Sequence, residues 1–479
     1  MKLTRRKFLS TAAIAAGSSA LLGRIQSALG KTAEYATEAA SEHKHTAKYT
    51  PVITPNGSTL PHTMKNGVKE FHLIAEVIKH EVAPGMVINA WGYNGRTPGP
   101  TIEAVEGDRI RILVENKLPE PTSVHWHGIF LPNGMDGVNG LNQPPIPPGE
   151  TFVYEYDLPQ YGTYMYHPHL DEMIQIAMGM MGFLIIHPKN PPDPPIQRDF
   201  AIFLHEWRVE PGSATPNPMF MEDHNLFSFN SRVFPGTDPL VCKLGDRVRF
   251  RFGNIGQHIH AIHLHGHRFW VVETDGGQIP KSAWWPETTV VVAPGQTRAV
   301  EWVADNPGDW AFHCHLLHHP MNAMSHEIPN LIGVDQKAVS KKVEKLVEGY
   351  MEMGSHGMHE MTEMNMQGPP NTLPMMGGQG QFGPIGMGGM FTVVKIREDI
   401  SSYDDPGPYK NPPGTVAWPL GGEKPKSQAS QAAAYTCPMH PEVVSDKLVD
   451  CPKCGMKLVP KKTDPSKSGE PKQEHKHER

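Results

Sequence analysis

Cysteine is scarce in this 479-residue chain, which has only 5, unevenly placed. A disulfide framework is therefore excluded as the source of its stability. Charge of one sign is also lacking, because 44 basic and 50 acidic residues leave a formal net charge of −6, which gives no indication of nucleic-acid binding. After residue 30 no apolar run approaches the ~20 residues of a membrane span, so we expect none in the mature chain.

Glycine, proline, histidine and methionine are abundant instead. The 46 Gly and 47 Pro exclude a helical bundle and favour an all-β protein with loose segments. The length is ample for about three units. Imidazole, thioether and thiolate groups are the ligand set that favours copper over magnesium or calcium, and the chain has 27 His and 25 Met.

The first 30 residues predict export from the cytoplasm. Thr4-Arg5-Arg6-Lys7 precedes a small-residue apolar run from Ser10 to Gly23, a pattern that resembles a bacterial twin-arginine signal and predicts a periplasmic protein. A general secretory signal with an incidental Arg pair is the alternative, and it also leads out of the cytoplasm. Residues 31–66 have no periodicity and predict a flexible arm.

The body of the chain is an internal repeat. Glu106-Gly107-Asp108-Arg109 returns 138 residues later as Leu244-Gly245-Asp246-Arg247, and His125-Trp126-His127 returns as His263-Leu264-His265. Polar and apolar residues alternate in short segments such as Arg247–Phe252 and Thr151–Tyr156, which is the pattern of half-buried strands. Two homologous Greek-key β-sandwich domains are predicted, over 67–190 and 196–398.

Histidine pairs of the form His-x-His occur eight times, against about 1.5 expected by chance. Two such residues project to the same side of a strand, because the side-chain period is two. In His313-Cys314-His315 the sulfur therefore points away from both imidazoles, and one tripeptide can serve two metal sites. Cys314, His260 and His319, with Met324 as a weak axial ligand, are the ligand set of a blue copper site.

Together these motifs resemble the two-domain bacterial branch of the multicopper oxidases, the laccase and copper-tolerance family. The resemblance implies cupredoxin-like domains and four coppers per chain equivalent. It implies type 1 ligands His260, Cys314, His319 and Met324; type 2 ligands His125 and His263; and type 3 ligands His127, His167 and His315 on one ion and His169, His265 and His313 on the other. His258 and His267 match no ligand position.

The resemblance also implies a reaction and an assembly. A reductant, cuprous ion or a phenolic compound, would give electrons to the type 1 copper, and Cys314, His313 and His315 would carry them to the trinuclear cluster, where O₂ is reduced to water. Asp136 matches an acid that helps to deliver protons, although Asp136-Gly137 is equally a turn signal. Each repeat supplies four cluster histidines, and the resemblance to the two-domain branch implies that the cluster lies between the subunits of a homotrimer.

Four further segments lie within or after this body. Residues 351–390 contain ten Met, with His356 and His359 among them, and predict a cuprous-ion-binding insert or a low-complexity lid, after a helix over 339–349. Residues 400–434 predict a linker and 461–479 a disordered tail. Residues 435–460 resemble a heavy-metal-binding module, in which Cys437, His440, Cys451 and Cys454 could hold Zn or Cu(I). A Cys451–Cys454 disulfide is the alternative. Cys242 is predicted to be a buried thiol.

Two other functions fit parts of this pattern. A non-catalytic copper-sequestering protein would explain the Met-rich and Cys-containing appendages. A copper nitrite reductase would share the two-domain trimer, but it needs the blue copper in the first domain, where Pro168 stands in place of a cysteine. We therefore predict an exported oxidase with O₂ as acceptor.

Overall fold

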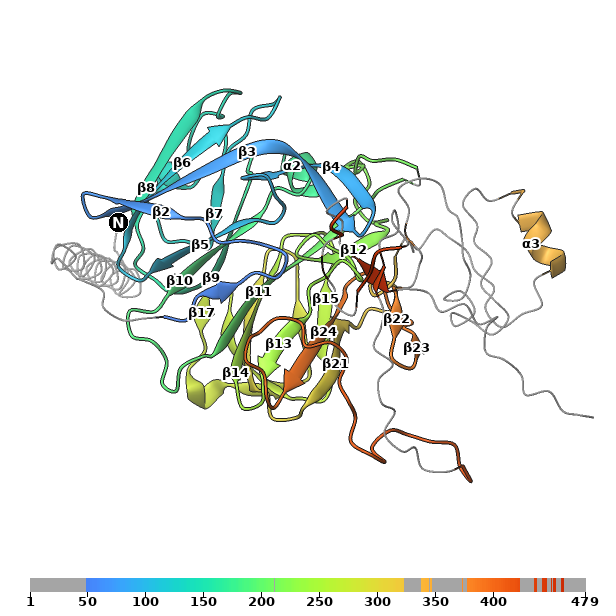
Figure 1. Cartoon of the computed structure of the whole chain (residues 1–479). Helices are drawn as coiled ribbons and strands as arrows, with labels where there is room; N and C mark the ends of the chain where they lie inside the picture. The colour runs from blue at the N-terminus through green and yellow to red at the C-terminus, as the bar shows by residue number, and fades with distance from the viewer. Residues whose placement is uncertain are drawn as a thin grey trace, which may run out of the picture. The chain divides into compact units, whose positions relative to one another are not determined.

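The structure is a computed structural model of the chain. It describes residues 49–210, 212–322, 337–343, 345–346, 373, 377–422, 435–436, 442–445, 449, 451–453 and 458–460. Strands far outnumber helices among them, which confirms the all-β prediction. In Figure 1 residues 50–190 run from blue to green, and residues 196–322 run from green to yellow.

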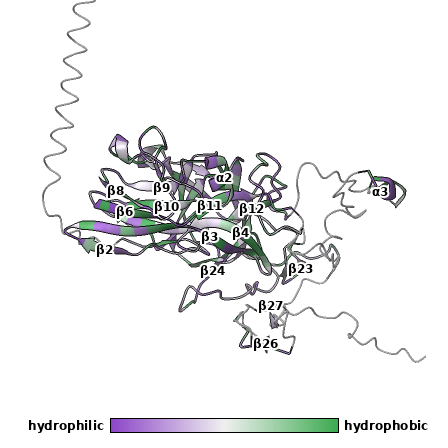
Figure 2. Ribbon diagram, turned by 90° about the horizontal axis from the view of Figure 1, so that it is seen from above, coloured by the Kyte–Doolittle hydropathy of each residue, from purple (hydrophilic) through white to green (hydrophobic). Residues whose placement is uncertain are grey.

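The first sandwich consists of two sheets. One has the strand order β2-β3-β6-β8, with β4 also paired to β3, and the other has the order β5-β10-β9-β7. The strands are β2 His62–Lys65, β3 Val68–Ala83, β4 Met86–Tyr93, β5 Gly99–Val105, β6 Arg109–Asn116, β7 His125–His127, β8 Thr151–Asp157, β9 Gly162–His167 and β10 Gly182–His187. Hydrophilic and hydrophobic residues are interspersed along β3 and β6 (Figure 2), and Ile110, Ile112 and Val114 of β6 are buried. Both sheets contribute to one core.

The second sandwich repeats this topology. One sheet has the order β1-β11-β14-β20-β16-β17, with β12 on β11 and β18 on β16, and the other has the order β13-β24-β21-β15-β19. The strands are β1 Val52–Ile53, β11 Arg198–Trp207, β12 Leu226–Phe229, β13 Leu240–Lys243, β14 Arg247–Asn254, β15 His260–Leu264, β16 Phe269–Thr274, β17 Gly277–Gln278, β18 Trp285–Glu287, β19 Thr289–Val292, β20 Thr297–Val303, β21 Gly308–Cys314 and β24 Phe391–Arg397.

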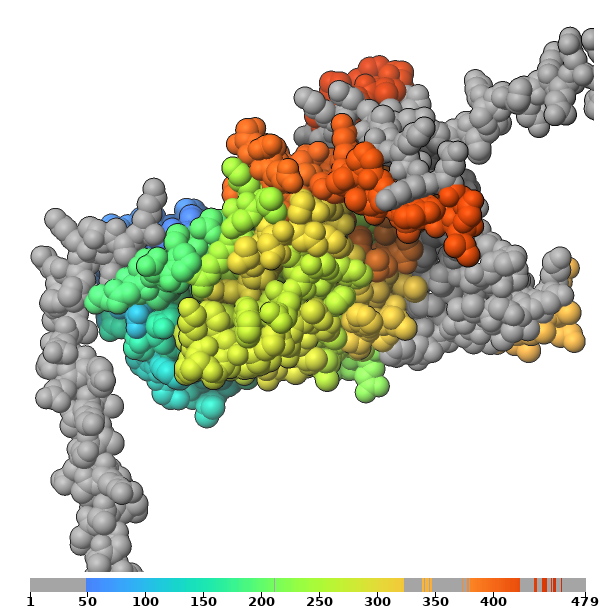
Figure 3. Space-filling view, turned by 90° about the horizontal axis from the view of Figure 1, so that it is seen from below, coloured from blue at the N-terminus to red at the C-terminus, as the bar shows by residue number. Residues whose placement is uncertain are grey.

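The repeat in the sequence is thus a repeat of strand pairing. The path β13-β24-β21-β15 copies β5-β10-β9-β7, and β11-β14-β20 copies β3-β6-β8 with the same parallel and antiparallel pairs. The strands expected at Thr151–Tyr156 and Arg247–Phe252 are β8 and β14. Residues of the second sandwich form a continuous surface in green and yellow on the face that Figure 3 shows.

The remaining elements are short. They are the 3₁₀ turns η1 Asn133–Met135 and η2 Lys281–Ala283, the helices α2 Glu172–Ala177 and α3 Lys337–Val343, and the strands β22 Gln379–Gly380, β23 Gly383–Pro384, β25 Tyr435–Thr436, β26 Val444–Ser445 and β27 Val459–Pro460. None of the described helices has the length and hydrophobicity that crossing a bilayer requires.

Two predictions about loose segments need correction. The arm expected over 31–66 is wrong in its second half, because β1 pairs with β11 and β2 pairs with β3. Such short strands are stabilised by distant partners, which local composition does not reveal. The helix expected over 339–349 is α3, Lys337–Val343, and Lys345 and Leu346 lie in a turn. Leu346 is exposed, so it provides no packing that would extend the helix.

A buried polar network joins the two sandwiches. Arg251 on β14 donates to both carboxylate oxygens of Asp199, at 2.8 and 2.9 Å, and to the hydroxyl of Thr163 on β9 at 2.8 Å. The Thr163 hydroxyl in turn donates to Glu273 on β16 at 2.9 Å. Bidentate pairing satisfies the buried guanidinium and gives the junction a defined geometry.

A second contact between the sandwiches makes stability depend on pH. His80 on β3 is buried, and its Nε2 donates to the carbonyl of Ser231 at 2.6 Å. Burial lowers the pKa of His80 to about 4. Because the unfolded chain takes up this proton at the ordinary pKa of 6.5, the contribution of neutral His80 is complete above pH 6.5 and is lost as pH falls towards 4.

We expect this one group to lower the free energy of unfolding by on the order of 3 kcal/mol across that interval. Denaturant unfolding at pH 7 and pH 4.5 measures the effect, and His80→Gln should make the difference between the two pH values smaller. His72→Gln, an exposed control on the same strand, should behave like the parent chain. Equal pH dependence in the parent and His80→Gln would contradict the assignment.

Candidate metal centres

Three donor atoms meet inside the second sandwich. Cys314 Sγ lies 3.3 Å from His319 Nδ1 and 3.9 Å from His260 Nδ1, and the two Nδ1 atoms are 3.2 Å apart. All three side chains are fully buried. This is the two-histidine, one-cysteine set of a blue copper site. Met324, predicted as the axial ligand, lies outside the described residues.

The strand pairing explains how these residues meet. β15 and β21 pair with Ile262 opposite Cys314 and His263 opposite His313. Alternation along β21 places Cys314 towards His260, two residues before Ile262, while His313 lies beside His265 on the other face. The turn after β21 returns His319 to the sulfur.

The donor set fits copper on its chemistry. Burial lowers the pKa of His319 to about 2, so its imidazole is neutral, as metal binding requires. Cys314 has a sulfur, the soft ligand that a blue copper site needs, at the point where the two Nδ1 atoms converge. Cys242, the other buried thiol of this sandwich, lies on β13 among apolar side chains, as predicted, and burial raises its pKa.

Glu206 is a residue of this centre that the sequence did not reveal. Its Oε2 lies 3.6 Å from His260 Nε2, and both atoms are buried without a hydrogen bond. Burial lowers the pKa of His260, but Cys314 and Glu206 outweigh this effect and raise it to about 9. A carboxylate behind a metal-binding imidazole orients the ring and raises its basicity. The sequence offered one indication of this role, which is that Glu206 is an acidic residue at the end of the mostly apolar segment that forms β11.

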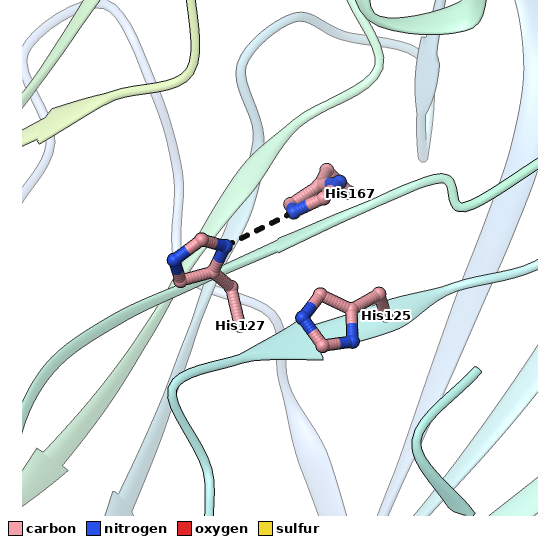
Figure 4. Close-up of side chains that lie close together, drawn as sticks. All are labelled: His125, His127 and His167. Carbon is pink, nitrogen blue, oxygen red and sulfur yellow. Dashed lines mark hydrogen bonds between the residues drawn. The ribbon is translucent and has the colours of Figure 1, made fainter. Parts of the chain in front are cut away.

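Four cluster histidines of the first sandwich lie together. His125 and His127 come from β7, and His167 ends β9. Figure 4 shows the three rings turned towards one another, with the 3.2 Å contact from His127 Nδ1 to His167 Nε2 as a dashed line. The ring of His169 lies 5.5 Å from that of His125, and its Nε2 is 2.8 Å from Glu172 Oε1 on α2. Burial lowers the pKa of His167 to about 3, which leaves it neutral.

Asp136 lies beside this quartet. It ends η1, and its backbone carbonyl accepts a 2.8 Å hydrogen bond from His125 Nδ1. Its carboxylate oxygen Oδ1 is 3.4 Å from the same nitrogen. Asp136 is therefore both a turn residue and a neighbour of the candidate ligand His125. Its contacts occupy His125 Nδ1, so His125 Nε2 is left for a metal.

The second quartet lies on the other sandwich. The ring centroids of His263 are 4.7 Å from His265, 5.7 Å from His313 and 5.4 Å from His315. His263 Nδ1 contacts the Thr288 carbonyl and the Thr289 hydroxyl, both at 2.8 Å, which leaves its Nε2 for a metal. His265 and His315 are exposed.

Within one chain the two quartets contact different ends of β19. His127 donates to the carbonyl of Gly295, which follows β19, whereas His263 contacts Thr289, at the start of β19. The strand between these points is about 10 Å long at ~3.3 Å per residue. The two histidines of one chain therefore contact residues near opposite ends of this strand.

The first sandwich has no counterpart of the cysteine-containing centre among its described residues. Thr122 stands at the repeat position of His260, and its hydroxyl donates to Gln175 Oε1 on α2 at 2.6 Å. Both residues are buried. The hydrogen bond between the neutral side chains of Thr122 and Gln175 therefore lies where the second sandwich has its cysteine centre.

Several predicted metal ligands lie outside the described residues. They include Cys437, His440 and Cys454 of the C-terminal module, and His356 and His359 of the Met-rich segment. Cys451 of the module is described and buried, packed with Leu458.

Comparison with known proteins gives the family of the chain. Residues 76–191 and 208–332 each match a family described as multicopper oxidase, and residues 434–461 match a heavy metal binding domain. The chain therefore belongs to the multicopper oxidase family, and copper is the cofactor of this family. The heavy-metal-binding module predicted at the C-terminus is confirmed as a domain match.

Two solved structures resemble the chain. The blue copper oxidase of Nitrosomonas europaea aligns with a TM-score of 0.52 and 26% identity, over 68% of this chain and 85% of that one. The multicopper oxidase mgLAC aligns with a TM-score of 0.52 and 28% identity, over 71% of this chain and 91% of that one.

Curated relatives match shorter parts. A probable nitrite reductase-hydroxylamine oxidoreductase fusion protein of Kuenenia stuttgartiensis is 32% identical over 55% of this chain and 31% of its own length. Copper resistance protein A of Escherichia coli is 43% identical over 24% of this chain and 19% of its own length. Laccase-1 of Cryptococcus neoformans is 33% identical over 38% of this chain and 34% of its own length. The chain thus spans about a third or less of these relatives.

Proposed function

We propose that this protein is an oxidase that takes single electrons from a reductant and reduces O₂ to water. The observation that carries the proposal is the tripeptide His313-Cys314-His315. Its sulfur belongs to the buried centre with His260 and His319, while its two imidazoles belong to the second quartet. One short stretch of backbone therefore connects two metal sites.

Copper held at these sites would supply one-electron oxidation at the cysteine centre and multi-electron reduction of O₂ at the histidine cluster. The chain itself provides the ligands and their orientation. Burial excludes water from Cys314, His260 and His319, and Glu206 orients the His260 ring. His263 and His167 each have Nδ1 at a backbone carbonyl, which leaves Nε2 for the metal.

Proton supply at the cluster is assigned to Asp136. Its carboxylate is beside His125 and is partly exposed, so it can exchange protons with solvent. A carboxylate in this position can hold a proton close to a ligand of the oxygen-reducing site. On the other side, Pro320 follows His319 and offers no acid.

We also infer that the cluster forms between subunits of a homotrimer. His127 and His263 of one chain contact residues near opposite ends of β19, and His265 and His315 are exposed in the single chain. A ring in which the first quartet of one subunit faces the second quartet of the next would bring eight imidazoles together, and a heterologous contact of this kind closes by rotation.

The reductant is proposed to be cuprous ion or a phenolic compound. Two relatives carry names that point this way, copper resistance protein A and Laccase-1. The ten Met of residues 351–390 could supply soft sulfur ligands for cuprous ion, and the C-terminal module could bind a further heavy metal. The twin-arginine pattern of the first 30 residues supports a periplasmic location.

Oxygen uptake by the copper-loaded chain tests this function. We expect steady, many-turnover uptake with either cuprous ion or a phenol as reductant. A protein that only sequesters copper would take up no more than stoichiometric oxygen and then stop, and this result would contradict the proposal.

Deleting residues 351–388 distinguishes the two reductants. If the Met-rich segment delivers cuprous ion, the deletion should lower cuprous oxidation and leave phenol oxidation nearly unchanged. Phenol oxidation is the internal control for folding and copper content. Unchanged cuprous oxidation would show that this segment does not deliver copper.

Nitrite reduction is not favoured. The Kuenenia relative has nitrite reductase in its name, but Thr122 and Gln175 occupy the first-sandwich position that a blue copper would need.

A further inference from the structure

A third group of metal-binding side chains lies beside the cysteine centre. Glu206, His224 and His258 each present a ligand atom, and all of these atoms are within 4.8 Å of one another. His224 Nδ1 is 3.1 Å from His258 Nε2. None of the three residues belongs to the four-copper set.

The backbone fixes this group in place. Glu206 Oε1 accepts hydrogen bonds from the amides of Gln257 and His258, the latter at 3.0 Å. The Asn254 side chain donates to the His258 carbonyl at 2.7 Å. Gly256 leaves room for the carboxylate, because a Cβ there would lie 2.0 Å from Glu206 Oε2. The ligand positions are therefore held before any ion arrives.

The group also has free donor capacity and a route from solvent. Glu206 Oε2 is buried and completes no hydrogen bond. His224 is buried, and its Nδ1 faces His258 Nε2 at 3.1 Å, so both nitrogens lie on the side of Glu206. His258 is half-buried, and its neighbours Gln257 and Ile259 are exposed, so an ion can enter past His258.

We propose that Glu206, His224 and His258 form an additional cation site, for a borderline divalent ion such as Zn²⁺ or Cu²⁺. Two imidazoles and one carboxylate are the protein ligands of open zinc sites. Imidazole disfavours calcium and magnesium, which take oxygen ligands, and the group has no sulfur for cuprous ion.

Occupancy of this site is coupled to the cysteine centre. Glu206 lies 3.6 Å from His260, a candidate copper ligand, and a cation bound to Glu206 offsets its negative charge there. Phe227 packs on His319 with ring centroids 3.8 Å apart and on His258 at 5.4 Å, so the two centres also share a wall. We expect a bound divalent cation to raise the reduction potential of the cysteine centre, because it removes charge that favours the oxidised metal.

Zinc binding by the full chain, loaded only with the four coppers of the proposed oxidase, tests the site. Equilibrium dialysis against Zn²⁺, followed by metal analysis, is applied to the parent chain and to His224→Gln and His258→Gln. Each variant should lose about one zinc per chain, with the affinity of that site lowered at least ~10-fold. His72→Gln, an exposed control, should bind as the parent does. Zinc held by the C-terminal module is common to all four proteins and cancels in the comparison.

A second readout does not depend on zinc counting. Added Zn²⁺ should shift the blue absorption or the midpoint potential in the parent, and this shift should disappear in both variants. Equal zinc content in the parent, His224→Gln and His258→Gln would overturn the site. Because zinc content is measured without turnover, loss of oxygen uptake alone would contradict the proposed oxidase and not this site.

Discussion

Cys314→Ser is expected to remove the intense blue absorption of the copper-loaded protein and to reduce oxygen uptake to background. The hydroxyl that replaces the sulfur is a hard, poor ligand for a blue copper site. It also breaks the sulfur link between the centre with His260 and the two imidazoles His313 and His315. Both losses follow from one atom, so they should appear together.

Cys242→Ser is the matched control. Cys242 is equally buried in the same sandwich, but it lies on β13 among apolar side chains. Placing a hydroxyl there should cost about 1–3 kcal/mol of stability and leave the colour and the oxygen uptake of the folded protein intact. Absorption and oxygen uptake are measured on both variants at equal copper loading. Blue colour in Cys314→Ser would contradict the assignment of this centre.

The second large effect concerns subunit complementation. His127→Ala breaks the first quartet and His265→Ala breaks the second, so each variant alone should be inactive. If the cluster forms between neighbouring subunits, coexpression of the two variants places an intact first quartet against an intact second quartet in some interfaces. With random assembly about one quarter of the interfaces are intact, and about a quarter of the parent activity should return.

Coexpression of His127→Ala with His167→Ala is the control. Both substitutions damage the first quartet, so no combination of subunits restores a cluster and activity should stay at background. Oxygen uptake per copper-loaded chain is the measurement, with sedimentation to confirm equal assembly. Failure of the first pair to recover activity, in oligomers of normal size, would place the cluster within one chain.

Much of the fold followed from the sequence because its signals are periodic. Alternation of polar and apolar residues in Arg247–Phe252 predicts a strand, and the repeated motifs predict that the second domain has the pairing of the first. β1 shows the limit of this reasoning. Val52 and Ile53 form a strand only because β11, more than a hundred residues later, supplies the hydrogen bonds.

Some residues of the candidate sites could likewise be predicted from the sequence, and others could not. His-x-His spacing and the central cysteine of His313-Cys314-His315 identify ligands, because each motif is a local feature of one strand. Glu206 and His224 carry no such pattern. They are isolated in the sequence and reach His258 only through the packing of β11 and the turn after β14.

The sequence by itself determined the class of this protein: a duplicated β-sandwich with a cysteine and histidine ligand set for copper. Only the tertiary structure decided that Glu206 faces His260, that a third histidine and carboxylate group lies beside this centre, and that His127 and His263 contact opposite ends of β19. The reason is physical. Strand periodicity is set by neighbouring residues, whereas distances between side chains depend on how remote strands pack.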